Sequence, residues 1–450
     1  MTEEGGRHEM AVALGANLGD RRSALRGAVH ALAGMGEVVA VSRLYEGPAR
    51  ELPPGAREAD RAPYLNAVVR LASHLPPEAV LAACLAHEAA AGRDRGREAW
   101  HGARALDLDL LLCDREVRDG PFLRLPHPRL ATRDFALQPL ADVWPDAPRP
   151  GTGGGWRRCA PAGEDGALRA VEGPGWADLA GAPPIPSPGE DLLAEGERRR
   201  LAGGPPLYAF GQVGSTADVL RALAAAGAPH GAAVVAERQA AGRGRHGRTW
   251  WAEAGEALLL SVLLRDGAAL GGLMPLFVGL AVVEAAEAAG SGRLALKWPN
   301  DVVTPDGRKV AGVLVERTGD LSALVGVGVN LRVPRTAPPE VRARAAGLAD
   351  TGMAPPRARL LRHVLARLET LAAEARARGE AALLERWRRR SVTLGRTVEV
   401  HPAGGAPAFS GVAVAVADDG ALVVRGRDGR ERRVHAGEVS LTGAAAPPPG

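Results

Sequence analysis

Two aspartates in a short apolar run have the spacing that most directly indicates chemistry. Asp107 and Asp109 stand one residue apart in the run LDLDLLL. Because side chains alternate along a β-strand, both carboxylates are predicted on one face, with Leu106, Leu108 and Leu110 on the other. Adjacent carboxylates repel unless cations neutralise them, and Mg²⁺ typically bridges such groups to substrate phosphates. The alternative is a pair of salt-bridged surface acids.

Basic residues on both sides of the two aspartates favour the metal interpretation. They are Arg93, Arg95, Arg104, His127 and Arg133. The planar guanidinium of arginine suits phosphate oxygens, so a metal pair among arginines indicates phosphoryl transfer. The sequence has no GxxxxGK[ST] phosphate loop, which excludes a P-loop fold as the carrier of this chemistry.

A second candidate is the glycine–arginine run GRGRHG at 242–247. It matches GxGxxG formally, but a dinucleotide site requires a helix to follow, and here Arg248, Thr249 and Trp250 lead into another predicted strand. Glycines permit close backbone approach and arginines supply charge, so the run is interpreted as a flexible clamp on an anionic ligand. A solvated or RNA-binding run is the alternative.

The composition is that of a multidomain globular protein. The chain has 450 residues, with 46% hydrophobic and 24% charged residues, which predicts two or three domains. A net charge of +4 suits phosphate ligands and is too small to indicate nucleic acid by itself. Three cysteines are too few and too scattered for a disulfide framework. No signal peptide and no run of about 18 apolar residues is found, so a cytoplasmic protein without membrane contact is expected.

The first part of the chain alternates strands and helices. Strands are predicted near 10–14, 37–46, 65–72 and 105–113, and helices at 21–35 and 76–91. Asp20 is a plausible N-cap for the first helix. The order β-α-β-β-α-β is that of a ferredoxin-like α/β sandwich.

Residues 146–206 are rich in Pro and Gly and are interpreted as an irregular tail and linker without a helix-turn-helix. A second alternation follows. Its predicted strands lie near 207–212, 232–238, 257–264, 294–298, 309–317 and 321–329, and its predicted helices near 216–226, 273–290, 340–348 and 357–389. Asp306-Gly307 predicts a hairpin turn, and Asp419-Gly420 and Asp428-Gly429 predict turns of a small barrel within 393–442.

The first part resembles the 6-hydroxymethyl-7,8-dihydropterin pyrophosphokinases. The matching stretches are GANLGDR at 15–21, YLNAVV at 64–69, GRDR at 92–95, GARALDLDLL at 102–111 and PHPRLATRDF at 126–135. The resemblance implies that Asp107 and Asp109 hold two Mg²⁺ ions between ATP and the pterin. The remaining roles that it implies are pterin binding by Tyr64, Asn66 and Phe135, catalysis by Arg93 and Arg104, and ATP binding by Arg95, His127 and Arg133.

Two departures from this family occur near the aspartates. Ala103 stands where the family commonly has Pro, and EAWHGAR at 98–104 is one residue longer than usual. Taken singly, Tyr64 and Phe135 are more often core aromatics, and His127 could be a turn residue.

The second part resembles the biotin–protein ligases. The matching stretches are GST at 214–216, QAAGRGRHGRTW at 239–250, KWPND at 297–301, KVAGVLVE at 309–316 and GVGVN at 326–330. A C-terminal SH3-like barrel at 393–442 is also implied. Ala217 stands where the family usually has Asn, and no DNA-binding helix-turn-helix is found, so no specific DNA binding is expected.

The resemblance implies a route through biotinyl-5′-AMP to a lysine of a biotin carboxyl carrier domain. Lys309 is the implied catalytic residue, where a structural lysine would merely cap a strand edge. Trp250 and Asn330 are implied at the nucleotide, and Asp301 would orient the attacking lysine or one or more Mg²⁺ ions. The residues implied in biotin binding are Ser215, Thr216, Gln239, Arg243, Gly244, Arg245 and Lys309.

The sequence thus predicts an α+β multidomain protein with two activities. The predicted parts are a pyrophosphokinase domain at 8–160, a linker at 161–205, a ligase catalytic domain with a mixed sheet at 206–391 and an SH3-like domain at 392–443. Three alternatives remain: a lipoate or octanoate transferase in the second half, one inactive half that serves as a binding module, and a basic nucleic-acid binder. A lipoate transferase would lack the GRGRxGRxW loop and the terminal barrel.

Overall fold

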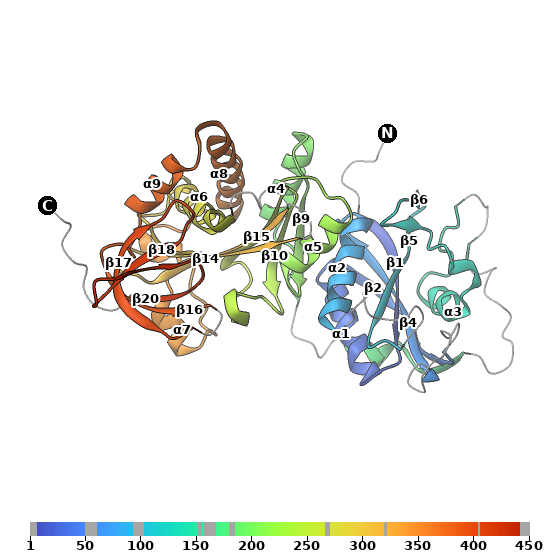
Figure 1. Ribbon diagram of the computed structural model, residues 1–450. Coiled ribbons are helices and arrows are strands. Elements are labelled where there is room, and N and C mark those ends of the chain that lie inside the picture. The colour runs from blue at the N-terminus through green and yellow to red at the C-terminus, as the bar shows by residue number, and fades with distance from the viewer. Residues whose placement is uncertain are drawn as a thin grey trace. The chain divides into compact units, whose positions relative to one another are not determined.

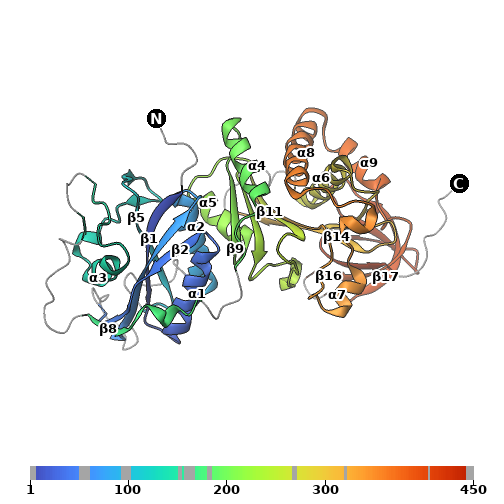
Figure 2. The same cartoon turned by 180° about the vertical axis from the view of Figure 1, so that it is seen from behind.

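The computed structural model describes most of the chain in two compact units (Figures 1 and 2). The described residues are 7–49, 61–92, 103–150, 155–156, 168–179, 185–265, 271–318, 322–403 and 406–441. Unit 1 comprises Met1–Pro188 with Tyr208–Ala228 and Arg238–Ala241, and unit 2 comprises Gly189–Leu207, Pro229–Glu237 and Gly242–Gly450.

Unit 1 is built on a six-stranded sheet of order β5-β1-β4-β3-β8, with β2 also paired to β4. Its strands are β1 (His8–Ala16), β2 (Glu37–Val41), β3 (Leu44–Gly47), β4 (Tyr64–Ser73), β5 (Asp107–Cys113) and β8 (Arg169–Glu172). The order of elements from β1 to β5 is the predicted β-α-β-β-α-β, except that the strand expected at 37–46 is divided into β2 and β3. The pairs β1–β4 and β1–β5 are antiparallel, with Gly15 opposite Asn66 on one side and Asp107 on the other.

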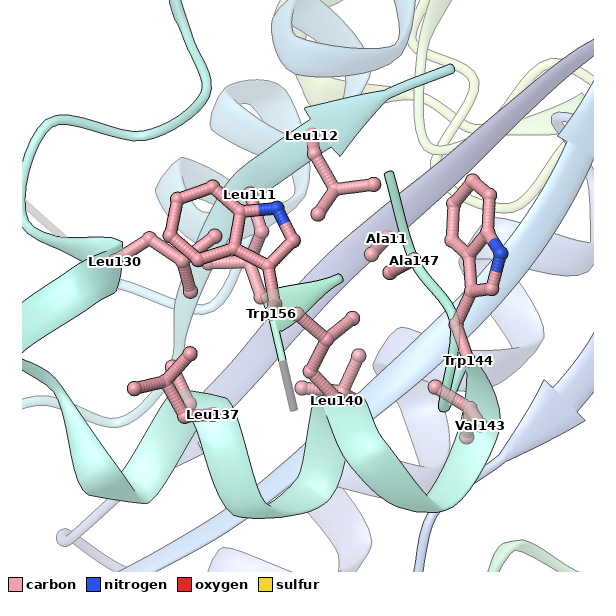
Figure 3. Packing of buried hydrophobic residues seen from close by; sticks show 12 residues of the cluster. Ala11, Leu111, Leu112, Leu130, Leu137, Leu140, Val143, Trp144, Ala147 and Trp156 are labelled. Atoms are coloured by element: carbon pink, nitrogen blue, oxygen red, sulfur yellow. The ribbon is translucent and has the colours of Figure 1, made fainter. Parts of the chain in front are cut away.

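Helices cover both faces of this sheet. The helices α1 (Arg21–Ala33) and α2 (Pro77–Ala90) lie on one side of the sheet, and α3 (Asp134–Val143) lies on the other (Figure 1). Asp20 caps α1, as predicted, because its side chain accepts a hydrogen bond from the Ser23 amide. The apolar core under α3 contains Leu137, Leu140, Trp144 and Trp156, packed against β1 and β5 (Figure 3).

From Ala11 to Gly15, the face of β1 that looks toward α3 carries only small side chains. Ala11 and Ala13 pack on the α3 core, and Gly15 follows at the same period of two. Asp109 lies opposite Ala13 in the register with β5. No bulky side chain of β1 therefore covers the sheet at the end where Asp107 and Asp109 lie.

Residues 146–206 were predicted to be irregular, and this prediction is wrong for two of the described segments within that range. Strand β8 pairs with β3, and α4 (Glu190–Leu201) is a twelve-residue helix that belongs to unit 2. The apolar positions Leu192 and Leu193 are flanked by Pro and Gly, which hid the helical pattern. Two shorter strands, β6 (Arg118–Asp119) and β7 (Arg124–Leu125), pair beyond β5.

Unit 2 contains most of a mixed, largely antiparallel sheet of order β12-β13-β14-β15-β11-β10-β9. Its strands are β9 (Leu207–Val213), β10 (Ala233–Gln239), β11 (Ala257–Leu264), β12 (Ala295–Lys297), β13 (Asp301–Val303), β14 (Lys309–Arg317) and β15 (Ala323–Asn330). The predicted Asp306-Gly307 turn is confirmed, since Gly307 has a φ of 94° and its amide donates to the Thr304 carbonyl. Strand β13 was not predicted, because three residues are too few to show a period.

Five described helices, from α5 to α9, complete this half of the chain. The helix α5 (Thr216–Ala225) belongs to unit 1 and packs against α2, whereas α6 (Met274–Ala289) is the core helix of unit 2. The single helix predicted at 357–389 is two helices, α8 (Arg357–Arg378) and α9 (Ala381–Arg389), because Gly379 ends α8 with a φ of 77°. A short helix, α7 (Pro339–Arg344), precedes them.

The segment that contains α6 corrects the expectation that the sequence has no stretch long and apolar enough to cross a membrane. The segment Gly271–Ala289 is long and apolar enough by length and composition, but 72% of its apolar window is buried within the protein. It packs on α8 and β14, as the central helix of a folded core does.

The C-terminal segment forms a five-stranded sheet of order β19-β18-β17-β16-β20. The strands are β16 (Thr397–Pro402), β17 (Phe409–Val416), β18 (Leu422–Gly426), β19 (Glu431–Val434) and β20 (Gly437–Leu441). The predicted turns at Asp419-Gly420 and Asp428-Gly429 are confirmed by glycine φ values of 86° and 74°. The sheet has two ends, β19 and β20, and no pairing closes it among the described strands.

Candidate active sites

The two aspartates of β5 share one face, as the alternation predicts. Asp107 and Asp109 are half-buried, whereas Leu106, Leu108 and Leu110 are at most 3% exposed. The same alternation continues to Leu111, which packs in the core under α3. The two carboxylates therefore lie on the α3 face of the sheet, where the apolar core under α3 ends.

An arginine contacts each aspartate. The Arg104 guanidinium donates to Asp107 at 2.7 Å, and Arg133 donates to Asp109 at 3.0 Å. Both arginine side chains are at most 16% exposed, so these pairs lie in a partly dehydrated site where charge interactions are strong. The Arg104 Nε atom is buried without a hydrogen-bond partner, so a donor remains for an anionic ligand.

Gly15 stands at the centre of the predicted pterin residues. A side chain at this position would meet Asn66 Oδ1 at 3.6 Å, Asp107 Cβ at 3.8 Å and Tyr64 Cδ1 at 3.8 Å. Three side chains from the two neighbouring strands β4 and β5 therefore surround a position that has no side chain of its own. Asn66 is 7% exposed, and Tyr64 is half-buried.

The remaining predicted residues lie near Asp109. The Arg133 guanidinium lies 5.4 Å from the centre of the Phe135 ring, and His127 Nε2 lies 3.9 Å from Asp109. His127 Nδ1 accepts the Arg129 amide, so the neutral ring carries its proton on Nε2, facing the carboxylate. Burial lowers the pKa of His127. Arg93 and Arg95 lie outside the described residues, as does most of the EAWHGAR loop.

Two positioning residues were given no role in the sequence analysis: Glu88 lies outside the motifs, and Asn17 lies within GANLGDR. Glu88 on α2 is fully buried, and its carboxylate accepts the backbone N–H of Leu108 at 2.7 Å. Strand β5 is the edge of the sheet, so this N–H has no neighbouring strand to bond. Asn17 accepts the Arg104 amide at 2.6 Å and donates to the Ala62 carbonyl at 3.3 Å. A carboxylate and an amide thus fix the backbone on both sides of Asp107.

In unit 2 the glycine–arginine run forms a short hairpin. The Trp250 amide donates to the Gly242 carbonyl, and the Gly244 amide donates to Arg248. Arg243 and Thr249 form a bridge across it. Its tip turns at His246 and Gly247, whose φ values are 57° and 72°.

Trp250 closes this hairpin by lying across two strands. Gly312 of β14 and Gly328 of β15 are paired in register. A side chain would meet the Trp250 ring at 3.0 Å on Gly312 and at 2.6 Å on Gly328. Only glycine at these two positions leaves room for the Trp250 ring. The glycines of the motifs KVAG and GVGVN therefore contact the same side chain. The buried Trp250 Nε1 has no hydrogen-bond partner.

Lys309 lies beside the same ring. Its ammonium is 5.6 Å from the centre of the Trp250 ring and 2.6 Å from Asp301 Oδ1. Lys297 belongs to the KWPND motif but was given no role of its own. In the sheet it pairs in register with Asp301. Burial lowers the pKa of Lys297, and Lys309 lowers it further, against the opposing effect of Asp301. Lys309 and Asp301 thus form an ion pair by the face of the tryptophan, and Lys297 lies opposite Asp301 on the neighbouring strand.

Arg245 reaches this cluster from the hairpin. Its guanidinium donates to Asn300 Oδ1 at 3.2 Å, and Asn300 in turn donates to the Val313 carbonyl at 2.6 Å. Burial lowers the pKa of Arg245. Lys309 thus contacts the hairpin through the Trp250 ring, and Asn300 holds Arg245 of the hairpin to β14.

The other predicted residues of the second site lie in two places. Asn330 is 6% exposed and donates to the Ala346 carbonyl, while the Ala346 amide donates to the Lys309 carbonyl. Gln239 Oε1 accepts both the amide and the hydroxyl of Thr216, at 2.8 and 3.0 Å, at the N-terminus of α5. Ser215, the residue before that helix, is 4% exposed.

The hairpin also contacts the C-terminal sheet. Arg248 donates a hydrogen bond to Glu438 of β20, and His246 Nε2 lies 3.9 Å from the same carboxylate. The sheet is attached to the rest of unit 2 by the Trp298 indole, which donates to the Gly420 carbonyl at 3.0 Å. The hairpin and the C-terminal sheet therefore share an ionic contact.

Three family models match the chain in sequence order. They are the 7,8-dihydro-6-hydroxymethylpterin-pyrophosphokinase family at residues 11–145, the biotin/lipoate A/B protein ligase family at 211–332 and the biotin protein ligase C terminal domain at 393–442.

Individual relatives match the same halves. A biotin–[acetyl-CoA-carboxylase] ligase of Mycobacterium tuberculosis is 37% identical over 246 residues, which are 53% of this chain and 90% of the relative. A 2-amino-4-hydroxy-6-hydroxymethyldihydropteridine pyrophosphokinase of Porphyromonas gingivalis is 38% identical over 146 residues, which are 31% of this chain and 95% of the relative. A biotin protein ligase structure from Aquifex aeolicus, in complex with biotin and ATP, has a TM-score of 0.46 and 31% identity, covering 53% of this chain and 99% of that chain.

Proposed function

The chain belongs to the pterin pyrophosphokinase family through its first part and to the biotin–protein ligase family through its second, and from this premise we propose how its residues perform both reactions. It is a bifunctional enzyme. One activity transfers pyrophosphate from ATP to 6-hydroxymethyl-7,8-dihydropterin, and the other joins biotin to a protein.

The pyrophosphokinase proposal is carried by the arginine-paired aspartates beside Gly15. The open position at Gly15 would accept the pterin, with its edge on Asn66 and its ring between Tyr64 and Phe135. Arg104 and Arg133 would exchange their aspartate partners for phosphate oxygens when ATP binds, since a guanidinium serves either anion. Arg93 and Arg95 remain predicted phosphate ligands.

The donor set of this site fits Mg²⁺. Asp107 and Asp109 offer carboxylate oxygens from one face of one strand, which are the ligands that Mg²⁺ takes. Bound there, Mg²⁺ would neutralise charge on the phosphates of ATP. The pterin hydroxyl oxygen forms the new bond to the β-phosphorus of ATP, the bond to AMP breaks, and the hydroxyl proton is released. Positioning and charge neutralisation are the contributions that such a transfer requires from the protein.

The ligase proposal is carried by the Trp250 ring with the Lys309 ammonium over its face. Lys309 would stabilise negative charge as the biotin carboxylate attacks the α-phosphorus of ATP and pyrophosphate leaves. Trp250 and Asn330 would support the nucleotide, and Ser215, Thr216, Gln239 and the backbone from Arg243 to Arg245 would contact biotin. Lys297 and Asp301 would set the charge around Lys309, and Asp301 would also be the carboxylate ligand if Mg²⁺ accompanies the nucleotide.

The hairpin at 242–250 would protect the intermediate. Biotinyl-5′-AMP is a mixed anhydride that water hydrolyses, and a closed loop excludes water. A lysine amine of a biotin carboxyl carrier domain would then attack the anhydride and release AMP. The family match at 393–442 supports biotin rather than lipoate as the acid that is activated.

Matched variants of the full chain test the two assignments. Asp109→Ala should abolish AMP release with the pterin substrate, while leaving biotin transfer within about twofold of wild type. Lys309→Ala should lower biotin transfer by roughly 100-fold or more and leave pyrophosphoryl transfer unchanged, as expected for lost charge stabilisation. Loss of both activities from either substitution would contradict two separate sites.

A further inference from the structure

A cluster of three potential metal ligands, with the carboxylate of Asp114 beside it, lies at the end of β5 away from the two aspartates. His8 begins β1, and Cys113 ends β5. Asp114 and Glu116 follow in the turn after β5. The ligand atoms of His8, Cys113 and Glu116 all lie within 4.8 Å of one another. We propose that this cluster is a zinc site that fastens the first strand of unit 1 to the turn after β5.

The distances bring the side chains near the spacing of a tetrahedral site. His8 Nδ1 lies 3.2 Å from Asp114 Oδ2 and 3.8 Å from Glu116 Oε1, and Cys113 Sγ lies 3.9 Å from Asp114 Oδ2. Tetrahedral zinc with bonds of about 2.0–2.3 Å separates its ligand atoms by about 3.3–3.7 Å. These three distances lie within a few tenths of an ångström of that range, whereas the group of His8, Cys113 and Glu116, whose atoms lie within 4.8 Å of one another, would contract by up to about 1–1.5 Å to bind one ion.

The backbone of the turn fixes this arrangement. The Asp114 amide donates to the Glu9 carbonyl at 2.8 Å, and the Glu9 amide donates to Asp114 Oδ1 at 3.0 Å. Asp114 has a φ of 43°, a left-handed conformation that Asp tolerates better than most residues. Its Oδ1 atom is thereby directed to the backbone and its Oδ2 atom to His8.

An outer contact orients the glutamate in the same way. Arg118 donates to Glu116 Oε2 at 2.8 Å, so Oε1 faces His8. Partners of this kind, which hold one atom of a ligand side chain and leave the other for the metal, are typical of metal sites.

The donor types select the metal. Thiolate and imidazole are ligands of zinc and similar transition metals and poor ligands of Mg²⁺, so this cluster differs from the aspartate site in the ion that it takes. Cys113 is fully buried, while the side chains of His8 and Asp114 are 33% and 41% exposed, so an ion can enter from the solvent side.

Metal titration of the full chain tests the proposal. After chelator treatment and dialysis, zinc is titrated in competition with a chromophoric chelator, and cobalt is added separately to report thiolate coordination by its charge-transfer absorption. The wild type should bind one zinc in this site, and cobalt should produce the thiolate band. Cys113→Ser should remove the band and weaken zinc binding by roughly 100-fold or more, beyond the effect of losing an outer contact.

Two cysteine variants provide controls. Cys84→Ser changes a buried cysteine of α2, and Cys159→Ser changes the third cysteine of the chain; both should retain the cobalt band. His8→Gln, at a half-exposed strand end, should weaken zinc binding without unfolding and keeps the test decisive if Cys113→Ser folds poorly. Zinc should raise the unfolding temperature of the wild type and not that of either ligand variant. Equal zinc affinity in wild type and His8→Gln, or loss of the cobalt band in a control, would overturn the proposal.

Discussion

At the scale of the residue, the aspartate site depends on a carboxylate that never faces the substrate. Glu88 reaches from α2 to the one backbone N–H that separates Asp107 from Asp109. A buried amide without an acceptor is unfavourable by about 1–3 kcal/mol, so Glu88 stabilises the strand at the position where both ligands emerge.

Removal of the Glu88 carboxylate should therefore weaken Mg²⁺ binding by Asp107 and Asp109, although Glu88 itself is not a metal ligand. Glu88→Ala is expected to raise the Mg²⁺ concentration needed for half-maximal pyrophosphoryl transfer by about 10–100-fold, the range found for outer contacts of metal ligands. Glu88→Gln keeps a carbonyl oxygen in the same place and should restore most of the Mg²⁺ affinity. The measurement is the Mg²⁺ dependence of AMP release, and an equal loss in both variants would show that Glu88 acts by charge alone.

A second residue of α2 predicts a pH dependence. Burial lowers the pKa of His87 from the ordinary value of 6.5. The unfolded chain then binds a proton at His87 more tightly than the folded chain, so the free energy of unfolding falls as the pH drops below about 6.5 and is fully retained above it. Urea denaturation between about pH 5.5 and 8 should show a smaller loss at acid pH in His87→Gln than in wild type. His30→Gln, a change of the same type on α1, should not reproduce this difference.

The sequence predicts some of these residue contacts and not others. The common face of Asp107 and Asp109 follows from local alternation, and Asp20 was recognised as a cap because it lies three residues from its donor. Glu88 could not be recognised, since its partner is a backbone group on another element. Lys297 was likewise assigned no role until β12 and β13 placed it opposite Asp301.

At the scale of the element, two paired strands are made flat enough to hold an indole. Gly312 and Gly328 lie side by side under Trp250, and the ring connects the hairpin to Lys309. The two glycine motifs and the tryptophan were predicted separately, because the contact joins three elements that are distant in sequence.

One methyl group should disturb this contact. In Gly328→Ala the new Cβ would lie 2.6 Å from the Trp250 ring, so the ring must shift and take the hairpin with it. We expect kcat/KM for ATP in biotin transfer to fall by about 10-fold or more, as misplacement of a positioning element does. Gly326→Ala lies on the same strand with no atom nearer than 3.5 Å and should remain close to wild type. Similar losses in both variants would indicate a general effect on β15.

Element boundaries were predicted best where turns carry a clear signal. The Asp-Gly turns located the ends of β17 and β18, and a run of eight residues that is apolar except for Ser261 defined β11. Helix α4 was missed because its apolar positions are few and its flanks contain Pro and Gly. The split between α8 and α9 was missed because one glycine was not enough to interrupt a strong helical pattern.

At the scale of the whole molecule, the described residues of the two sites share no side chain. A ligand at one site changes the activity of the other only if it binds one of two protein conformations more tightly and these conformations also differ at the other site. Saturating pterin should therefore change the kcat/KM of biotin transfer by less than about twofold, measured at fixed ATP with a carrier domain as acceptor. A larger change that survives in Asp109→Ala would reveal communication through the fold rather than turnover at the first site.

Helix α4 has a practical consequence for anyone who divides this gene. The Arg357 guanidinium, 11% exposed, holds Asp191 of α4 and Glu237 of β10, and Glu237 also accepts the Gly189 amide. Strand β8, by contrast, completes the sheet of the first enzyme. A cut made at the end of the Pro-rich stretch, near 205, would discard α4 and leave Glu237 and Arg357 without these neighbours. Expression fragments that end after 179 and begin before Gly189 would keep β8 with the first sheet and α4 with the second, but would still separate α5 from α2, on which it packs.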